Sequence, residues 1–231
     1  MRLGLIIPSS NTTMEYEFWK ISSGWAAVHA ARMRLQKITL RDLEEMEEQM
    51  LDAAVRVADA HVDIMGYGCT SGSLFKGKGH AQEIEKKIQE KTGVPAVAAA
   101  RAVVEALDKL HINRVSVATP YTDEINELER RFLQQNKIDV LKIKGLDMVK
   151  NHEVGSIDPE ETYELAKSVY VPEANGLFIS CTNFRTVEVI NQLEKELGTA
   201  VVSSSTATFW AMMRKAGINR RLEKYGRLFL I

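Results

Sequence analysis

Short apolar segments alternate with longer amphipathic segments along the whole chain of 231 residues. The segments expected to form strands are Leu3–Ile7, Ala27–Met33, Asp63–Gly66, Pro95–Ala98, Arg114–Ala118, Val140–Ile143, Gly176–Ser180 and Ala200–Ser203. The helices expected around and between them are Met14–Ile21, Leu40–Ala60, Ala81–Lys91, Ala102–Leu110, Asp123–Gln135, Pro159–Val169, Thr186–Leu197 and Thr206–Lys215. Because strands that alternate with helices pair in parallel, this pattern predicts an α/β fold.

Two landmarks recur 112 positions apart, which indicates an internal repeat. Pro8 and Pro120 each end an expected strand, and Cys69 and Cys181 each begin a Cys-Thr dipeptide after an expected strand. We therefore expect two similar Rossmann-like lobes, each built on a parallel sheet. The carboxyl ends of parallel strands are where such sheets bind ligands. A cleft between the lobes would carry one cysteine from each side.

The repeat also suggests how the chain divides. We expect an N-terminal lobe of residues 1–95 together with 206–231, and a C-terminal lobe of residues 96–205. The formal net charge of -1 provides no attraction for nucleic acid or for an anionic membrane surface. The first apolar stretch spans five residues, too short for a signal-peptide core, and no later run is long enough to cross a bilayer. These features predict a cytoplasmic protein whose two cysteines stay reduced.

Both cysteines are followed by polar turn residues rather than lying inside apolar runs. A strand-to-helix turn directs backbone N–H groups and a helix N-terminus at one point, which stabilises a thiolate or a substrate carboxylate. The equivalent placement of Cys69 and Cys181 predicts a catalytic pair. No ligand cluster with metal-binding spacing occurs. We therefore expect no metal, and we expect no nucleotide either, because Gly77-Lys78-Gly79 lacks the hydroxyl residue that a phosphate-binding loop needs after its lysine.

Three further polar residues have two open interpretations each. Asn11 lies in the polar cluster after the first strand and serves either as a helix cap or as a ligand contact. Tyr121 follows Pro120 in the second half and serves either as a packing residue or as a donor to an anion. Asn151 lies in a polar segment and serves either as a turn residue or as a ligand contact.

The chain resembles the cofactor-independent aspartate/glutamate racemase superfamily, and within it the maleate cis-trans isomerases and the related arylmalonate decarboxylases. The motifs that carry the resemblance are Ile7-Pro8-Ser9-Ser10-Asn11-Thr12-Thr13-Met14-Glu15, Gly68-Cys69-Thr70-Ser71-Gly72-Ser73, Thr119-Pro120-Tyr121, Asn151 with Ile157-Asp158-Pro159, and Ser180-Cys181-Thr182-Asn183. They follow one another in order over nearly the whole chain.

The resemblance implies two lobes related by a pseudo-twofold axis, and a homodimer. It also implies that Cys69 is the nucleophile and that Cys181 is the acid/base. The positions that hold the two carboxylates of the substrate are implied to be Asn11, Thr70, Ser71, Tyr121, Asn151, Thr182 and Asn183. Decarboxylase relatives lack the first cysteine, so the presence of both argues against decarboxylation.

These features together predict cis-trans isomerisation of maleate to fumarate through a covalent succinyl-cysteine-type intermediate, with a small dicarboxylate as the only expected ligand. The alternatives are a two-cysteine racemase or epimerase of a small carboxylate, an arylmalonate-type decarboxylase, and a non-catalytic dicarboxylate-binding protein. The glycines of Lys76-Gly77-Lys78-Gly79 make that segment a candidate for the loop that closes the cleft.

Overall fold

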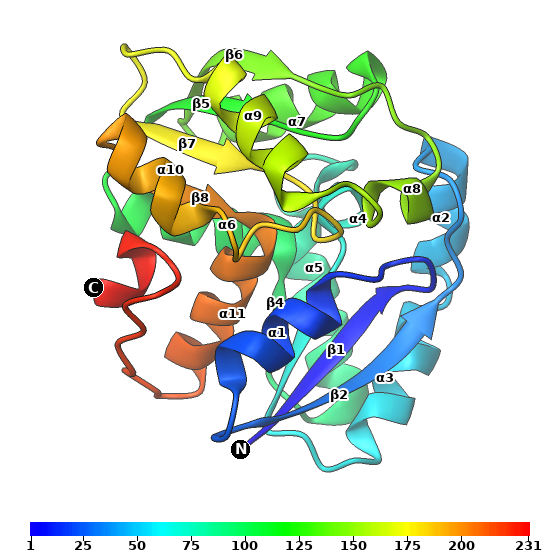
Figure 1. The fold of residues 1–231 in the computed structure, drawn as a ribbon. Helices are drawn as coiled ribbons and strands as arrows, with labels where there is room; N and C mark the ends of the chain where they lie inside the picture. Colours follow the sequence, from blue (N-terminus) through cyan, green and yellow to red (C-terminus); the bar gives the residue numbers. More distant parts are fainter.

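Two four-stranded parallel sheets form the framework of the computed structural model, which describes residues 1–231. The first sheet has the order β2-β1-β3-β4 and comprises β1 (Arg2–Pro8), β2 (Ala27–Met33), β3 (Ile64–Tyr67) and β4 (Ala96–Ala98). The second sheet repeats this order as β6-β5-β7-β8 and comprises β5 (Arg114–Ala118), β6 (Asp139–Lys144), β7 (Gly176–Ile179) and β8 (Val201–Ser203). The predicted α/β fold with two similar lobes is confirmed (Figure 1).

Helices cover the sheets and connect their strands. They are α1 (Met14–Ser22), α2 (Leu40–Glu47), α3 (Met50–Ala58), α4 (Thr70–Leu74), α5 (His80–Thr92), α6 (Ala99–Lys109), α7 (Asp123–Gln135), α8 (Asn151–Val154), α9 (Pro159–Val169), α10 (Ile190–Leu197), α11 (Ser204–Lys215) and a final 3-10 helix, η1 (Arg227–Leu230). The longest, α5 and α7, have 13 residues each, and none of the helices combines the length and apolar character that crossing a bilayer requires.

Helix α6 begins three residues before its expected start, and the short helices α4 and α8 were not expected. Two further expected helices differ more, and each has a contact with another segment at the point of difference. The single helix expected over Leu40–Ala60 is divided into α2 and α3, and Gln49 at the break accepts a hydrogen bond from the backbone N–H of Arg34. The helix expected from Thr186 begins only at Ile190. The backbone N–H of Thr186 instead donates to the carboxylate of Glu17 on α1, 2.6 Å away. Both changes tie a helix end to a distant segment.

The junction between the lobes differs from the expected division at one boundary. Residue 95 was expected to end the N-terminal lobe, but β4 pairs with β3 and so extends the first sheet to Ala98. The first sheet therefore ends three residues beyond residue 95. Beyond it, α6 and α11 pack against each other, and α11 also packs on β3 and β4 of the first sheet. In Figure 1, α11 runs in the space between the two sheets.

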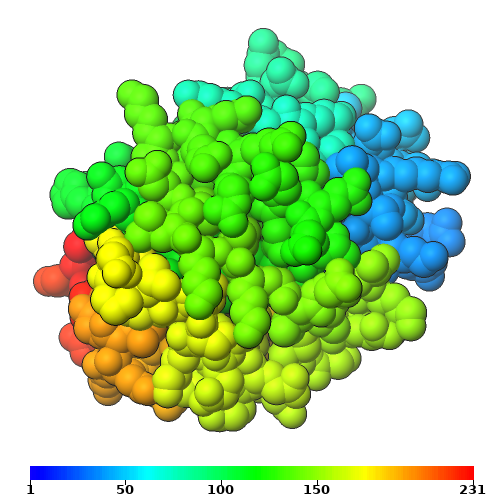
Figure 2. Space-filling view, turned by 90° about the horizontal axis from the view of Figure 1, so that it is seen from above, coloured from blue at the N-terminus to red at the C-terminus, as the bar shows by residue number.

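The two lobes also meet on the side where their strands end. Residues 34–39, which connect β2 to α2, lie against residues 149–151 of the second half. Ile38 donates its backbone N–H to Val149 at 2.8 Å, and Asn151 donates to Gln36 at 3.0 Å. Figure 2, which views this side from above, shows the chain around residue 150 next to the chain around residue 40. Residues 34–39 therefore cover the carboxyl ends of the strands.

Candidate active site

Cys69 follows β3 and occupies the N-cap position of α4. Its sulfur accepts a hydrogen bond from the backbone N–H of Gly72 at 3.3 Å and lies 3.7 Å from the hydroxyl of Ser71. A Cβ atom on residue 72 would lie 3.0 Å from this sulfur and 2.8 Å from the terminal methyl of Met46, so a side chain there would crowd the turn. The Gly72 donor was missed by the sequence analysis, although Gly-Cys-Thr-Ser-Gly is a turn-rich string that pointed to it.

Cys181 occupies the equivalent turn after β7, with a strained backbone. Its φ of 92° lies in the region that favours glycine. The conformation is held by Ser204 at the start of α11, whose hydroxyl accepts the Cys181 N–H at 3.1 Å. The sulfur accepts the backbone N–H of Asn183 at 3.4 Å. Backbone strain of this kind persists only where its surroundings impose it and is concentrated at functional sites.

The two thiols differ in how readily they ionise. Burial raises the pKa of the Cys69 thiol, and the Gly72 N–H and the Ser71 hydroxyl partly offset that rise. Burial raises the pKa of the Cys181 thiol further, to about 12, and a negative charge on Cys69 adds to the effect. Cys69 is therefore the easier thiolate to form, and Cys181 retains its proton. This difference suits a nucleophile paired with an acid.

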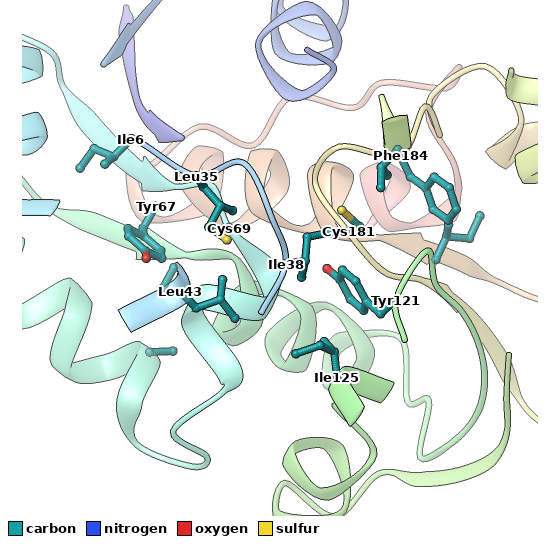
Figure 3. Packing of buried hydrophobic residues seen from close by; sticks show 14 of the residues in the cluster. Ile6, Leu35, Ile38, Leu43, Tyr67, Cys69, Tyr121, Ile125, Cys181 and Phe184 are labelled. Carbon is teal, nitrogen blue, oxygen red and sulfur yellow. The ribbon is translucent and has the colours of Figure 1, made fainter. Parts of the chain in front are cut away.

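Tyr121 lies between the two cysteines. Its side chain is 1% exposed and its hydroxyl is within hydrogen-bonding reach of the Cys181 sulfur. Negative charge on either cysteine raises the pKa of Tyr121. In the view of Figure 3, the Tyr121 hydroxyl and Ile38 lie between the cysteine side chains. The structure thus supports a donor role for Tyr121 as well as a packing role.

Asn11 serves both as a cap and as a contact across the cleft. Its side-chain oxygen accepts the backbone N–H groups of Thr13 and Met14 at 3.0 and 2.9 Å, at the start of α1. Its amide nitrogen donates to the hydroxyl of Thr182 at 3.2 Å. The Thr182 hydroxyl in turn donates to the carbonyl of Gly68 at 2.9 Å, beside Cys69. One chain of hydrogen bonds therefore links the two cysteine turns.

The asparagines near α8 mainly hold the lobes together. The side-chain oxygen of Asn183 accepts the N–H of Thr12 at 2.8 Å, and its amide donates to the carbonyl of Asn151 at 2.6 Å. The Asn151 amide donates to the hydroxyl of Ser10 at 2.8 Å, a partner that the sequence analysis did not single out. Asn151 begins a short helix rather than a turn. All the predicted site residues therefore gather in one region, but the Asn183 side chain is already engaged on both sides.

We expect the Asn183→Ala variant to lose about 2–3 kcal/mol in free energy of unfolding, because a hydrogen bond to Thr12 of the first lobe and a buried hydrogen bond to Asn151 of the second lobe are removed. Denaturant unfolding measures this loss. The matched control is Asn191→Ala. The half-buried Asn191 side chain also makes two hydrogen bonds, with Gly226 and Glu223, and so connects α10 to the C-terminal segment near the surface. Its expected loss is below about 1 kcal/mol. Equal losses in the two variants would contradict the clamp role of Asn183.

The site is covered by residues 34–39, and the glycine-rich candidate segment lies elsewhere. Leu35 and Ile38 are each 3% exposed and belong to the same apolar cluster as both cysteines. The segment Lys76–Gly79 instead lies against α7, where Lys78 donates its backbone N–H to Gln135. The β2–α2 connection reaches the cysteines because Ile38 and Gln36 pair with the second half. Within the same site, the buried hydroxyl of Thr70 has no protein partner.

The whole chain contains no group of three or more His, Cys, Asp or Glu side chains arranged to hold a metal ion. The polar groups of the site are instead hydroxyls, amides and backbone N–H groups around two thiols. Such neutral donors bind carboxylates without neutralising a neighbouring thiolate.

Comparison with known proteins identifies the family of the chain. The chain matches the arylmalonate decarboxylase family over residues 3–229. It is 25% identical to the maleate isomerase of Geobacillus stearothermophilus, over 98% of this chain and 96% of the relative. It is 28% identical to the arylmalonate decarboxylase of Bordetella bronchiseptica, over 87% of this chain and 85% of the relative.

A solved structure is similar over almost its full length. It is a cysteine-to-serine variant of the maleate cis-trans isomerase of Nocardia farcinica with a covalently bound succinylcysteine intermediate. The TM-score is 0.95 and the identity is 26%, over 99% of this chain and 97% of that chain. These matches confirm the resemblance predicted from the motifs. The chain belongs to the arylmalonate decarboxylase family.

Proposed function

We propose that this protein is a cofactor-independent maleate cis-trans isomerase that forms fumarate through a covalent succinyl-cysteine intermediate on Cys69. The observation that carries the proposal is the pair of buried thiols on equivalent turns, which lie in one apolar cluster together with Tyr121. The relatives named maleate isomerase support the choice of substrate.

The reaction needs one nucleophile and one proton donor. The Cys69 thiolate forms a C–S bond to one alkene carbon, and the π electrons move to the other carbon, which takes the proton of Cys181. The former double bond is then single and rotates. Cys181 takes the proton back, the double bond re-forms and the C–S bond breaks with return of the electron pair to sulfur. Atoms and electrons balance without a redox partner.

The carboxylates of the substrate need donors that the protein does not already use. The Thr70 hydroxyl has no protein partner, and the Tyr121 hydroxyl points into the site. The amides of Asn11 and Asn151 each have a second N–H beyond the bond already described. Ser71 supports the Cys69 sulfur. In this proposal Thr182 and Asn183 act mainly by holding these donors in place.

The test is incubation of the purified protein with maleate under reducing conditions, with fumarate followed by absorbance and by NMR. Parallel incubations with an arylmalonate and with single enantiomers of aspartate and glutamate test decarboxylation and racemisation. Fumarate formation alone supports the proposal. No turnover of maleate, or turnover only of another substrate, would overturn it.

The pH dependence of kcat/KM provides an independent check. The nucleophile is a thiolate, and burial places the pKa of Cys69 above its ordinary value. A raised pKa means that the reactive form increases as pH rises toward it. We therefore expect kcat/KM for maleate to increase about tenfold per pH unit between about pH 6 and pH 8. A pH-independent rate in that range would contradict the assignment of a thiol with a raised pKa as nucleophile.

We further propose a homodimer located in the cytoplasm. A reducing compartment keeps both thiols free, as the chemistry requires. For the dimer, α1 offers an apolar surface on which Trp19 is 62% exposed and Tyr16 is 44% exposed. Sedimentation of the wild type and of Trp19→Glu tests this surface. A wild-type monomer contradicts the dimer, and a dimer unaffected by Trp19→Glu contradicts the role of α1.

A further inference from the structure

The internal repeat extends to two buried glutamates. Glu17 on α1 and Glu129 on α7 lie 112 positions apart, which is the spacing of the two cysteines. Their side chains belong to residues that are 0% and 1% exposed. Burial of a carboxyl group is costly unless the group is hydrogen-bonded or uncharged. Each glutamate therefore needs a structural explanation.

Glu17 is extensively hydrogen-bonded. Its carboxylate accepts the backbone N–H groups of Thr186 and Val187 at 2.6 and 3.0 Å and the Thr186 hydroxyl at 3.0 Å. These contacts anchor the segment that follows Cys181 to α1. Glu17 is thus explained as a clamp between the lobes.

Glu129 has a different environment. One carboxyl oxygen lies 2.5 Å from the hydroxyl of Ser180, the residue directly before Cys181, and the other buried oxygen has no partner. Burial raises the pKa of Glu129 to about 8, so the carboxyl group is mostly uncharged at neutral pH. A buried carboxyl with one free oxygen, attached to the catalytic turn, is not accounted for by packing alone.

The ionisable groups that face Glu129 are those of the active site. Its negative charge raises the pKa of Cys181 and of Tyr121. The elements packed against α7 supply no neutralising cation. Helix α4 contains only Thr70–Leu74, which are uncharged, and the charged residues of β6 are exposed. Arg130, next along α7, donates to the backbone carbonyl of Val140.

We propose that Glu129 is a positioning residue for Cys181. In its uncharged form it holds the Ser180–Cys181 turn and allows negative charge to develop on the Cys181 sulfur. In its ionised form it opposes that charge. The consequence for catalysis rests on the proposed function, in which Cys181 becomes a thiolate after giving up its proton. The electrostatic link itself does not depend on the substrate.

The test uses a chain with a single thiol. Cys69→Ser leaves Cys181 as the only cysteine, and its rate of modification by methyl methanethiolsulfonate reports the thiolate fraction. Between about pH 6.5 and pH 9.5 the logarithm of the rate should rise with unit slope, flatten near pH 8 where Glu129 ionises, and then rise again. In Cys69→Ser with Glu129→Gln the rise should be unbroken, because glutamine stays uncharged.

The two profiles should coincide near pH 6.5 and differ about tenfold near pH 9.5, since one nearby charge shifts the pKa of the thiol by about one unit. The control is Glu17→Gln in the same background, which removes the equivalent buried carboxyl and should keep the flattening. The proposal would be overturned if the flattening near pH 8 persists in Glu129→Gln, or if Glu129→Gln changes the modification rate by the same factor at every pH. If Glu129→Gln does not fold, a Cys69→Ser profile with unit slope throughout overturns it instead.

Because maleate is not used, this result is independent of whether the protein isomerises maleate. Active protein whose Cys69→Ser form shows no flattening would reject the role of Glu129 alone. Inactive protein whose profiles follow the expected shapes would reject the proposed substrate alone.

Discussion

The Cys69→Ser variant is expected to lose at least about a thousandfold in kcat/KM for maleate. A serine hydroxyl does not ionise near neutral pH and adds poorly to an alkene, so the covalent step is removed. Serine can still accept the Gly72 N–H that now binds the sulfur, so the turn should persist. The measurement is the rate of fumarate formation, together with the thermal unfolding midpoint.

A matched control lies two residues along the same turn. Ser71→Ala removes the hydroxyl that lies beside the Cys69 sulfur but leaves the nucleophile. We expect a loss of about tenfold, as for a single supporting hydrogen bond to a charged group. If Cys69→Ser retained wild-type activity, the assignment of Cys69 as nucleophile would be wrong.

The Cys181→Ala variant is expected to stop turnover at the covalent stage. Cys69 can still add to maleate, with solvent slowly supplying the proton, but the base that removes this proton before expulsion of the thiolate is missing. Mass spectrometry should show a stable increase equal to one maleic acid, located on the peptide that contains Cys69. Steady-state activity should fall by at least about a thousandfold.

The control for this experiment is the double variant Cys69→Ser with Cys181→Ala, which contains no thiol and should gain no mass. An adduct on Cys69 also distinguishes isomerisation from racemisation, because proton removal next to a carboxylate forms no covalent bond to sulfur. Wild-type turnover without any adduct in Cys181→Ala would therefore contradict the covalent mechanism.

Much of the fold could be predicted from local pattern. Each strand boundary lies within one residue of its expected position. For the six strands other than β2 and β6 the reason is that a short buried parallel strand is a continuous apolar run bounded by turn residues. The ends of the helices differ more from their expected positions. One expected helix is divided near Gln49, whose side chain bonds to Arg34, and another begins late because the backbone N–H of Thr186 bonds to Glu17, far away in the chain.

The residues of the candidate site could also be predicted from the sequence, but the hydrogen-bonding role of each residue could not. Asn11 and Tyr121 each have two open interpretations; the structure shows the capping role of Asn11 and the burial of Tyr121, and their contacts with a ligand stay predictions. The Asn183 amide is engaged at both ends by backbone groups. Ser204 and Glu129 received no prediction, because nothing local in the sequence shows that α11 and α7 bring them to the Cys181 turn.

The sequence by itself determined the α/β class, the duplicated architecture and the pair of cysteines on equivalent turns. These follow from periodicity and spacing, which are properties of neighbouring residues and of the repeat. Only the tertiary structure decided that residues 34–39 cover the site, that Cys69 ionises more readily than Cys181, and that Glu129 carries an unpaired buried oxygen beside it. The physical reason is that burial and long-range hydrogen bonds set the energy of a charge, and neither is encoded in any short segment of the chain.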